Sequence, residues 1–496
     1  MPRQPPARAP ETGARPAAVE DARAGVLARV RARWREGWSM VRLRPFEQDT
    51  PHGRSQERYR RIALTTLSGL AVRAVGTLVG LVSVPLVLAY LGKERYGLWS
   101  TITTVVAWVA LFDFGIANGL VNCIARAHGR EDRAEAARYV STALALLLGI
   151  AAVLAVVLAV GAVHVPWSAV LAVRGAMDER TVTWSVIAAL ATFLVGMPLS
   201  VVPQIFAGYQ RAYVANAFAL VGTVAGLGVL LVALRAGAGM PALVVVFGVG
   251  ALISSALGLG WAMARGMPWL RFRASAVSRE AVGALMSRSA PIFLFQIGAL
   301  LVNETQSIIL AHRCGLATVA EYSIVMRLYV LSMGLIQAST ASFVPSFREA
   351  RERGDVAWLR AGFRQFLRAR VGLALAGGAA LVVLGNPLLR LWLRRSDISF
   401  GPAVWATLAV LMVAATWVTV YSDLLAILDR LWVLVLLVFF NGAVTVTLTY
   451  VLAPRFQVLG VLFASGAVTL LVFSWLIVLL ARPVLADEAE RRTAGA

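Results

Sequence analysis

Long apolar runs separated by short polar connections make up most of this chain between Ile62 and Ala481. A helix needs about twenty apolar residues to cross the hydrocarbon core of a bilayer, and each run has roughly that length or more. A strand barrel is excluded because its segments would be shorter and would alternate apolar with polar residues. We therefore predict an all-α polytopic membrane protein with about twelve transmembrane helices. The predicted helices are 62–91, 97–125, 140–165, 182–207, 214–234, 241–264, 289–311, 322–345, 371–393, 402–428, 431–453 and 458–481.

The composition agrees with this interpretation. Hydrophobic residues make up 59% of the chain and the mean hydropathy is +0.74. A soluble fold of that composition would need an implausibly large core. Only the predicted helix 371–393 conflicts locally with the pattern, because it contains the breakers Gly385, Asn386 and Pro387, followed by Arg390.

The net charge of +21 is unevenly distributed between the connections. Arginines gather in alternate connections, within 126–138, 265–288 and 348–370, whereas the connections 91–96 and 235–240 are short and carry few charges. By the positive-inside rule, the basic connections face the cytoplasm. This topology explains the basic charge without a nucleic-acid partner. It also predicts that both termini of this multi-pass protein are cytoplasmic.

The chain divides into five segments on this pattern. Residues 1–60 form a basic cytoplasmic tail, which is either disordered or, around Val26 and Trp34, an amphipathic helix on the anionic inner leaflet. The first apolar run begins too late for a signal peptide. The remaining segments are an N-terminal six-helix lobe at 61–264, a cytoplasmic inter-lobe loop at 265–288, a C-terminal six-helix lobe at 289–481 and a cytoplasmic tail at 482–496.

An internal repeat supports the division into two lobes. The stretch from Gly92 to Arg138 has a counterpart from Gly315 to Arg364, and each copy begins with a glycine in a predicted external turn. In each copy a tyrosine, a long apolar helix, a basic loop and a helix with an acidic start then follow in order. Because each copy contains an even number of helices, the two are parallel in the membrane and related by an axis along its normal. Two such lobes would enclose a central cavity suited to alternating access, although duplication without transport is also compatible with the repeat.

Catalytic and metal-binding patterns are not visible in the sequence. Cys123 and Cys314 lie in different membrane segments without metal or redox spacing, and we interpret both as packing residues. The four histidines fall in the tail, in loops or at helix ends. The sequence contains no Gly-rich phosphate loop and no nucleophile motif. We therefore expect no enzymatic activity, no cofactor and no metal.

Arg73 is the first of the polar residues inside the helices, which are costly in lipid and usually face the protein interior. It shares one helical face with Gly69, Gly76 and Gly80, and we expect this small-residue face to pack against protein. A guanidinium there either pairs with a carboxylate of another helix or binds an anionic ligand, and its fork geometry suits phosphate.

The predicted helix 289–311 supplies complementary groups. Gln296, Asn303 and Ser307 form one polar stripe, with Glu304 beside it. Glu304 could pair with Arg73, or could take up and release a proton during transport because burial raises the pKa of a carboxyl group. Arg327, near the outer end of the next helix, either contacts an anion at the outer mouth or snorkels to the interface.

Two aspartates complete the candidate set. Asp113 projects opposite to the Gly115, Asn118 and Asn122 face of its helix, unless the helix kinks at Gly115, in which case it could reach the cavity. Asp423 lies near the inner end of its helix and is either a coupling residue or an interface charge. We thus group Asp113, Glu304 and Asp423 as candidates for coupling or ion pairing, and Arg73, Gln296, Asn303 and Arg327 as candidates for substrate binding.

Several motifs resemble a known family. The segment "VPLVLAYLGKERYGLW" (84–99), the "DFG" of 113–115 and the charged loop after it are similar to the start of Wzx-type polysaccharide flippases, in the multidrug/oligosaccharidyl-lipid/polysaccharide exporter superfamily. The segments "AEYSIVMRL" (320–328) and "FVPSF" (343–347) resemble the matching part of the second lobe. The detailed resemblance covers about a quarter of the chain. The basic tail is not part of the family pattern.

The resemblance implies a flippase that carries undecaprenyl-pyrophosphate-linked oligosaccharides from the inner to the outer leaflet of the bacterial cytoplasmic (inner) membrane for O-antigen or exopolysaccharide synthesis. Its expected partners are the lipid-linked oligosaccharide, the membrane and, as candidates, other polysaccharide-assembly proteins. The assignment of Arg73 to the pyrophosphate is our own inference from the residue.

Three alternatives remain at this point. A cation-coupled multidrug exporter of the same superfamily would favour a net negative cavity. A membrane polysaccharide polymerase or glycosyltransferase would call for a sizeable external loop with catalytic residues. A scaffold that recruits partners through the basic tail would need neither a cavity nor buried charges.

Overall fold

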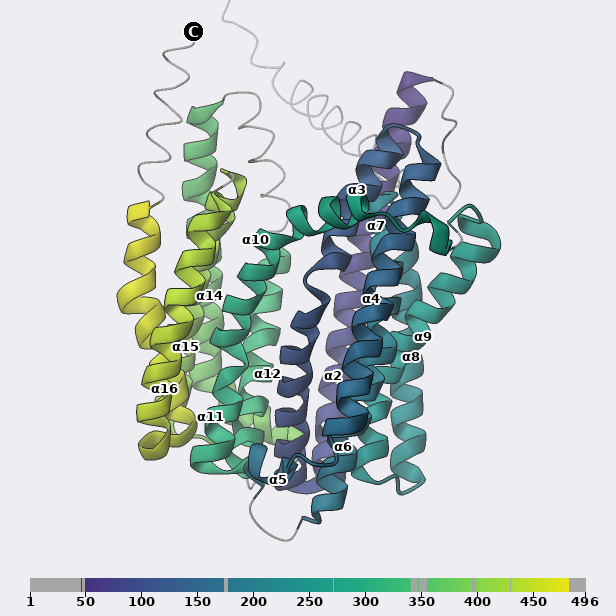
Figure 1. The fold of residues 1–496 in the computed structure, drawn as a ribbon. Helices are drawn as coiled ribbons and strands as arrows, with labels where there is room; N and C mark the ends of the chain where they lie inside the picture. Colours follow the sequence, from purple (N-terminus) through teal and green to yellow (C-terminus); the bar gives the residue numbers. More distant parts are fainter. Residues whose placement is uncertain are drawn as a thin grey trace, which may run out of the picture. The chain divides into compact units, whose positions relative to one another are not determined.

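The fold is taken from a computed structural model, which describes residues 46, 50–173, 177–270, 272–339, 347, 355–394, 398–428 and 430–480. The chain forms two compact units, Met1–Gly69 and Leu70–Ala496. Helices make up almost all of the described part of the second unit, and most of them run roughly parallel (Figure 1). The amphipathic helix considered around Val26 and Trp34 lies outside the described residues.

The described residues of the N-terminal half form eight α-helices and two short helical turns. They are α2 (Pro51–Ala110), η1 (Leu111–Asp113), α3 (Ile116–Gly129), α4 (Arg133–Gly161), α5 (Trp167–Val170), α6 (Glu179–Leu199), α7 (Val201–Gly208), α8 (Ala212–Arg235), α9 (Met240–Trp261) and η2 (Ala262–Gly266). The described C-terminal elements are η3 (Ala274–Ala276), α10 (Arg279–Asn303), α11 (Thr305–Cys314), α12 (Leu316–Ser339), α14 (Val356–Leu393), α15 (Pro402–Ile427), α16 (Leu431–Val468) and η4 (Thr469–Phe473).

Twelve membrane crossings result from these helices. Ten helical stretches of the described chain are long and apolar enough to span a bilayer. Two of them are double length and bend, at Gly92 in α2 and at Gln457 in α16, where the backbone leaves the helical region. The prediction of about twelve helices in two lobes of six is confirmed. We call residues 70–266 the N lobe and residues 293–480 the C lobe.

The internal repeat is visible in the backbone. Gly92 and Gly315 both adopt positive φ, 77° and 90°, at the turn between the first and second helix of each lobe. Asp132 and Asp355 both cap the third helix of their lobe, by accepting a hydrogen bond from the amide of the residue three positions later. Both pairs of residues are 223 positions apart, which is also the separation of the contacting pair described below. Equivalent residues thus play equivalent local roles in the two lobes.

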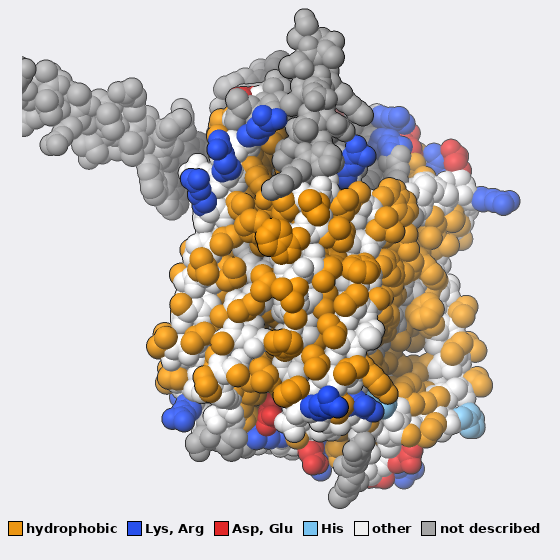
Figure 2. Space-filling model, turned by 90° about the vertical axis from the view of Figure 1, so that its left-hand side faces the viewer, with side chains coloured by type: hydrophobic (Ala, Val, Ile, Leu, Met, Phe, Trp, Pro, Cys, Tyr) orange, Lys and Arg blue, Asp and Glu red, His pale blue; other side chains and the backbone are white. Residues whose placement is uncertain are grey.

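Apolar side chains cover a broad band on the face shown in Figure 2, with arginine and lysine side chains beyond both edges of the band. Many large hydrophobic residues point outward from the helices; Val153, Val156, Val157 and Val160 of α4 are each more than 60% exposed. In water such a surface would drive aggregation, whereas in a bilayer it contacts lipid chains. The pattern is that of a multi-pass membrane protein.

The buried core is organised differently at the two ends of the helix bundle. We call the end with the Gly92 and Gly315 turns the Gly92 end, and the opposite end the Gly129 end. One apolar cluster runs across both lobes and includes residues beside the Gly92 and Gly315 turns, such as Leu91, Tyr96, Leu316 and Tyr322. Two further clusters lie within one lobe each, around Leu120 in the N lobe and around Phe366 in the C lobe. The described lobes therefore share a core near the Gly92 end, and their separate cores diverge toward the Gly129 end.

Several helices extend beyond the apolar runs that predicted them. The helices α4, α10 and α14 begin at Arg133, Arg279 and Val356, and α2 begins at Pro51, within the stretch assigned to the tail. Hydropathy marks the part of a helix inside the bilayer, while the helix itself continues until a cap stops it. The start of α10 packs on the N lobe, where Leu285 joins the core cluster, so the expected inter-lobe loop is partly helical. The breakers in α14 do not end the helix: Pro387 lies inside it, and Asn386 binds Phe400 through both its amide nitrogen and its amide oxygen.

Candidate functional site

A cavity of about 770 Å³ lies between the N lobe and the C lobe. Its walls come from the second helix of the N lobe, from α10 and α11, and from α12. The lining residues are Tyr96, Trp99, Ser100, Thr103, Thr104, Ala107, Ala110, Leu111, Asp113, Gln296, Ala299, Leu300, Asn303, Glu304, Ser307, Tyr322, Ser323, Met326, Arg327 and Val330. We call this the central cavity.

The predicted polar stripe of helix 289–311 faces this cavity. Gln296, Asn303 and Ser307 all line it, and Asn303 donates a hydrogen bond to the carbonyl of Ala299 at 2.7 Å. Glu304 lies at the single residue that separates α10 from α11. Helical periodicity places these four side chains on adjacent faces of the helix. All four line the central cavity.

Glu304 is held by the opposite lobe. Its Oε2 accepts a hydrogen bond from Oγ1 of Thr104 at 3.0 Å. The structure forms no ion pair between Glu304 and Arg73, the partner considered from the sequence, so its neighbour is a neutral hydroxyl. A carboxylate with a single hydroxyl donor keeps capacity to bind a proton or a cation.

Residues equivalent in the repeat meet at the Gly92 end of the cavity. The hydroxyls of Ser100 and Ser323, 223 positions apart, are 2.6 Å from each other. Lys93 and Glu321 form an ion pair across the lobes at 3.6 Å. Gly97 packs so closely on Leu316 that a Cβ there would lie 1.9 Å from the Leu316 carbonyl oxygen. These contacts close the cavity at the Gly92 end, and we call them the closing layer.

A buried network in the C lobe supports the closing layer from behind. The Tyr322 hydroxyl donates to Oε1 of Gln306, and the Gln306 amide donates to the Ser465 hydroxyl at 2.8 Å. Gln306 is 4% exposed and Tyr322 is also 4% exposed, so the network is shielded from solvent. Satisfied buried networks rigidify their surroundings. The wall of α12 is thereby fixed to α11 and α16.

Asp113 reaches the cavity because its helix breaks. The residues Leu111–Asp113 form a 3-10 turn, and Phe114 and Gly115 both have positive φ before α3 begins at Ile116. Oδ1 of Asp113 accepts the Gly115 amide at 2.7 Å. The break removes the periodicity that would have placed Asp113 on the opposite face, which is the outcome expected if the helix kinks at Gly115.

The two candidate arginines have different environments. Arg327 lines the central cavity and forms no ion pair with any described residue. Arg73 is exposed and is not among the residues lining this cavity. The expectation that its glycine face packs against protein is wrong, because a Cβ at Gly76 or Gly80 would meet nothing within 4 Å. A helical wheel shows which residues share a face but not what lies opposite that face.

Asp423 lies away from the central cavity. Its Oδ2 accepts a hydrogen bond from Arg370 of α14 at 2.9 Å, and the Arg370 guanidinium also lies over the Phe366 ring. Arg370 is almost completely buried, at 7% exposure of its side chain. The pair joins α14 to α15 within the C lobe.

Sequence reasoning found Ser307 but missed the other serine and threonine residues of the cavity and Trp99. Ser100 and Ser323 occupy equivalent positions of the repeat, so an alignment of the two copies by their glycines could have identified this pair. Trp99, Thr103 and Thr104 gave no such signal, because hydroxyl and aromatic residues are common in membrane helices.

Among the described residues, no group of three or more His, Cys, Asp or Glu side chains could hold a metal ion. Cys123 and Cys314 are free thiols. The Cys314 thiol donates to the Ala453 carbonyl at 3.2 Å.

Comparisons with known proteins find one matching family and a similar curated protein. The sequence model of a family described as "Polysaccharide biosynthesis protein" matches residues 62–350. A Salmonella typhi protein named "Putative O-antigen transporter" is 23% identical over 395 residues, which cover 78% of this chain and 88% of that protein.

Solved structures show the same fold. A multidrug resistance MATE family transporter of the MOP superfamily, in an inward-facing conformation, aligns with a TM-score of 0.72 and 16% identity over 86% of this chain and 99% of that one. An outward-facing conformation of a transporter of that family aligns with a TM-score of 0.61 and 16% identity over 86% and 96%. At these identities the likeness establishes the fold.

Proposed function

This chain belongs to the polysaccharide biosynthesis protein family and has the fold of MOP superfamily transporters. From these findings we propose that it is a membrane transporter of that superfamily and that its cargo is a polyprenyl-pyrophosphate-linked oligosaccharide. The cargo would move across the bacterial cytoplasmic membrane for surface polysaccharide synthesis. The Salmonella typhi relative, whose name refers to O-antigen transport, supports this choice of cargo. We also propose that the protein transports this cargo and does not catalyse a reaction on it.

The observation that carries the proposal is the chemistry of the central cavity. Most of its polar lining is neutral, with serine, threonine, asparagine, glutamine and tyrosine side chains from both lobes. Such groups donate and accept hydrogen bonds with sugar hydroxyls, and Tyr96 and Trp99 add apolar faces. Arg327 offers a guanidinium suited to an oxygen anion such as phosphate. A glycan with an anionic end matches this combination.

The closing layer supports alternating access as the mechanism. With the cores joined near the Gly92 end and diverging at the other, this state would receive cargo from the Gly129 end. The arginine-rich connections at the Gly129 end favour a cytoplasmic location for that side. Release on the far side would require the closing layer to separate, while the connections at the Gly129 end come together.

Asp113 and Glu304 are the candidates for coupling in this mechanism. Glu304 bridges the lobes through Thr104, so a proton or cation at its carboxyl group would act where the lobes separate. Asp113 lies at the helix break, where a change of local structure requires few broken hydrogen bonds. Asp423 is engaged with Arg370, and we assign it to the structure of the C lobe.

A second candidate function is supported by the charges in the cavity. Its lining contains two carboxyl groups, Asp113 and Glu304, and one guanidinium, Arg327, so its formal charge is negative when both carboxyls are ionised. A negative cavity favours a cation, as in a cation-coupled multidrug exporter. We place this second, because the family match and the named relative point to polysaccharide.

The experiment uses a strain that lacks this protein and measures whether lipid-linked oligosaccharide accumulates on the cytoplasmic leaflet. Wild type should reverse the accumulation, Arg327→Ala should not, and the matched control Arg364→Ala, at an exposed position of α14, should act as wild type. Membrane levels of each variant are measured alongside. No accumulation without the protein, combined with increased sensitivity to cationic drugs, would reject glycan transport in favour of the exporter.

A further inference from the structure

Helix α2 contains a backbone carbonyl that its own helix leaves without a donor. In an α-helix the Leu81 carbonyl would accept a hydrogen bond from the amide of residue 85, but this residue is Pro85, which has no N–H. Leu81 lies about 16 Å along the helix from the Gly92 turn, inside the hydrocarbon region. A carbonyl without a donor is costly there, because the bilayer core contains no water to replace it.

The missing donor comes from the other lobe. The indole N–H of Trp392, in the last turn of α14, donates a hydrogen bond to the Leu81 carbonyl at 2.6 Å. Trp392 is partly buried and packs against the apolar cluster that both lobes share, to which its buried neighbours Leu389 and Leu393 belong. The bond therefore joins a side chain of the C lobe to the backbone of the N lobe.

This contact has a counterpart in the internal repeat. Leu81 and Glu304 are 223 positions apart, like the two serines of the closing layer, so they occupy equivalent places in the first helix of each lobe. Glu304 accepts a hydrogen bond from Thr104 of the N lobe. Leu81 accepts its hydrogen bond from Trp392 of the C lobe. Each lobe thus receives a donor from the other at the same place in its first helix.

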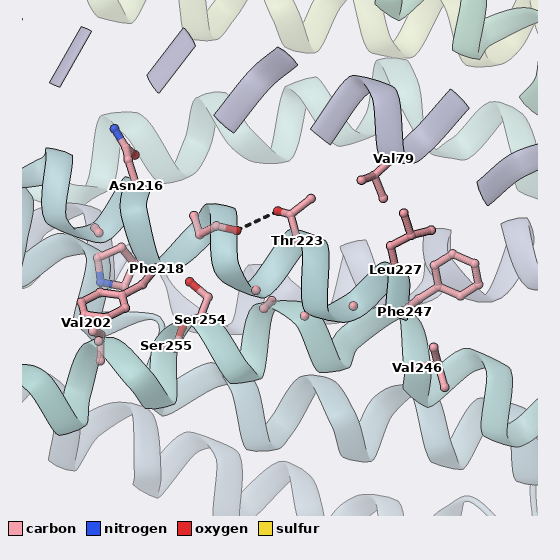
Figure 3. Close-up of a pocket in the computed structure, with 18 of the residues that line it drawn as sticks. Val79, Val202, Asn216, Phe218, Thr223, Leu227, Val246, Phe247, Ser254 and Ser255 are labelled. Carbon is pink, nitrogen blue, oxygen red and sulfur yellow. Dashed lines mark hydrogen bonds between the residues drawn. The ribbon is translucent and has the colours of Figure 1, made fainter. Parts of the chain in front are cut away.

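Within its own lobe, α2 is loosely packed near this contact. A cavity of about 440 Å³ lies between α2 and the helices α7, α8 and α9, and its lining includes Val79 and Ser83 of α2. Figure 3 shows Val79 opposite Leu227 of α8 in this cavity. A void removes packing contacts from the residues that line it. The N lobe therefore holds this part of α2 less firmly, and the bond from Trp392 contributes more to its position.

We propose that Trp392 is a positioning residue that latches the two lobes together in this state, and that Pro85 maintains the latch by withholding the helical donor from Leu81. The inference rests on the alternating access of the proposed function. When the lobes separate at the Gly92 end, the bond breaks, and the carbonyl and the indole N–H both lose their partner inside the membrane. The latch therefore favours the state in which the closing layer is formed.

The test measures how fast a membrane-impermeant thiol reagent labels Asn303→Cys, in the central cavity, from each side of the membrane. The full chain is used in a background without Cys123 and Cys314. Trp392→Phe keeps an aromatic ring but has no N–H, and it should raise labelling from the Gly92 side about tenfold, because an unpaired buried group no longer opposes separation. Labelling from the Gly129 side should not rise. Trp432→Phe, at a position of α16 that is 59% exposed, should leave both rates unchanged.

Restoring the helical donor tests whether Trp392 acts through the carbonyl. In Pro85→Ala the amide of residue 85 can bond to Leu81, so separation of the lobes no longer leaves that carbonyl unpaired. In this background Trp392→Phe should change labelling from the Gly92 side only about twofold or less. The analogue 3-benzothienylalanine in place of Trp392 has sulfur where indole has N–H, and it should reproduce the effect of Trp392→Phe without a change of shape.

Three outcomes would overturn the inference. Trp392→Phe could leave labelling unchanged, could raise it from both sides of the membrane, which indicates general loosening, or could have an equal effect with and without Pro85→Ala. If position 303 is labelled from both sides in the parent protein, these outcomes reject the latch alone. If it is labelled only from the Gly129 side in every variant while cargo is being transported, the alternating access of the proposed function fails.

Discussion

Substituting Gly97 by alanine should push the two lobes apart at the Gly92 end. The added Cβ would lie 1.9 Å from the carbonyl oxygen and 2.7 Å from the carbonyl carbon of Leu316. Real Cβ contacts stay above about 3.0 Å, and here the obstacle is backbone rather than a flexible side chain. The facing segments must therefore separate by about 1 Å, which would also stretch the Ser100–Ser323 contact.

The size of the effect follows from the cost of overpacking. Inserting a methyl group into a tight contact costs typically about 1–3 kcal/mol. The cost applies to the state with the closing layer formed and is absent once the lobes separate there. A penalty of about 2 kcal/mol shifts the equilibrium between the two states roughly thirtyfold.

The assay is labelling of Asn303→Cys, inside the central cavity, by a membrane-impermeant thiol reagent added on the Gly92 side. The background lacks Cys123 and Cys314, the two native thiols. Gly97→Ala should raise the labelling rate, whereas Gly228→Ala, where a Cβ meets nothing within 4 Å, should leave it unchanged. An unchanged rate in a folded Gly97→Ala protein would refute the idea that this contact closes the cavity.

Three further predictions concern charged residues. Glu304→Gln keeps an acceptor for the Thr104 hydroxyl but cannot bind a proton. Transport driven by an imposed proton gradient in vesicles should therefore fall at least about tenfold, while binding of cargo persists. A normal rate of gradient-driven transport would show that Glu304 does not couple transport to protons. Arg370→Ala leaves the Asp423 carboxylate without its partner and should lower the free energy of unfolding by about 2 kcal/mol. This value is moderate because the Asp423 side chain is one-third exposed. In a thermal unfolding assay, Arg370→Ala/Asp423→Ala should be more stable than Arg370→Ala alone. Burial raises the pKa of Glu57, but hydrogen bonds from Arg60, the Phe46 amide and Arg61 outweigh it and lower the pKa from 4.5 to about 2. The stabilisation is therefore present above pH 4.5 and is lost as the pH falls toward 2. Protection of the Phe46 amide against hydrogen exchange, taken relative to its intrinsic exchange rate at each pH, should fall in that interval, and the same fall in Glu57→Gln would contradict this assignment.

The helix count was predictable because the bilayer sets the length of each apolar run. The repeat was predictable for a similar reason: Gly92 and Gly315 take up a backbone conformation that other residues rarely adopt, and glycine therefore marks the same turn in both lobes. The ends of helices such as α4 and α14 were not predictable from hydropathy, since their first turns lie outside the bilayer.

The candidate site was predictable only in part. The spacing of Gln296, Asn303 and Glu304 correctly grouped side chains that line the central cavity. The Thr104–Glu304 and Ser100–Ser323 contacts depend on how the two lobes dock, which spacing within one helix does not encode. The position of Asp113 in the cavity could be predicted only by knowing that its helix breaks at Phe114 and Gly115. The exposure of Arg73 depends on what lies opposite α2, which the sequence of α2 does not encode.

The most direct test of alternating access through the central cavity is flipping by a protein cross-linked across the closing layer. Ser100→Cys/Ser323→Cys, in the background without native thiols, is reconstituted in vesicles with undecaprenyl-pyrophosphate-linked oligosaccharide, and flipping is measured before oxidation, after it, and after reduction. The hydroxyl oxygens of the two native serines lie 2.6 Å apart, so a disulfide should form in this state. Our account predicts that oxidation abolishes flipping, that reduction restores it, and that either single cysteine is unaffected. Full flipping by the cross-linked protein would contradict transport through a cavity that opens at the Gly92 end.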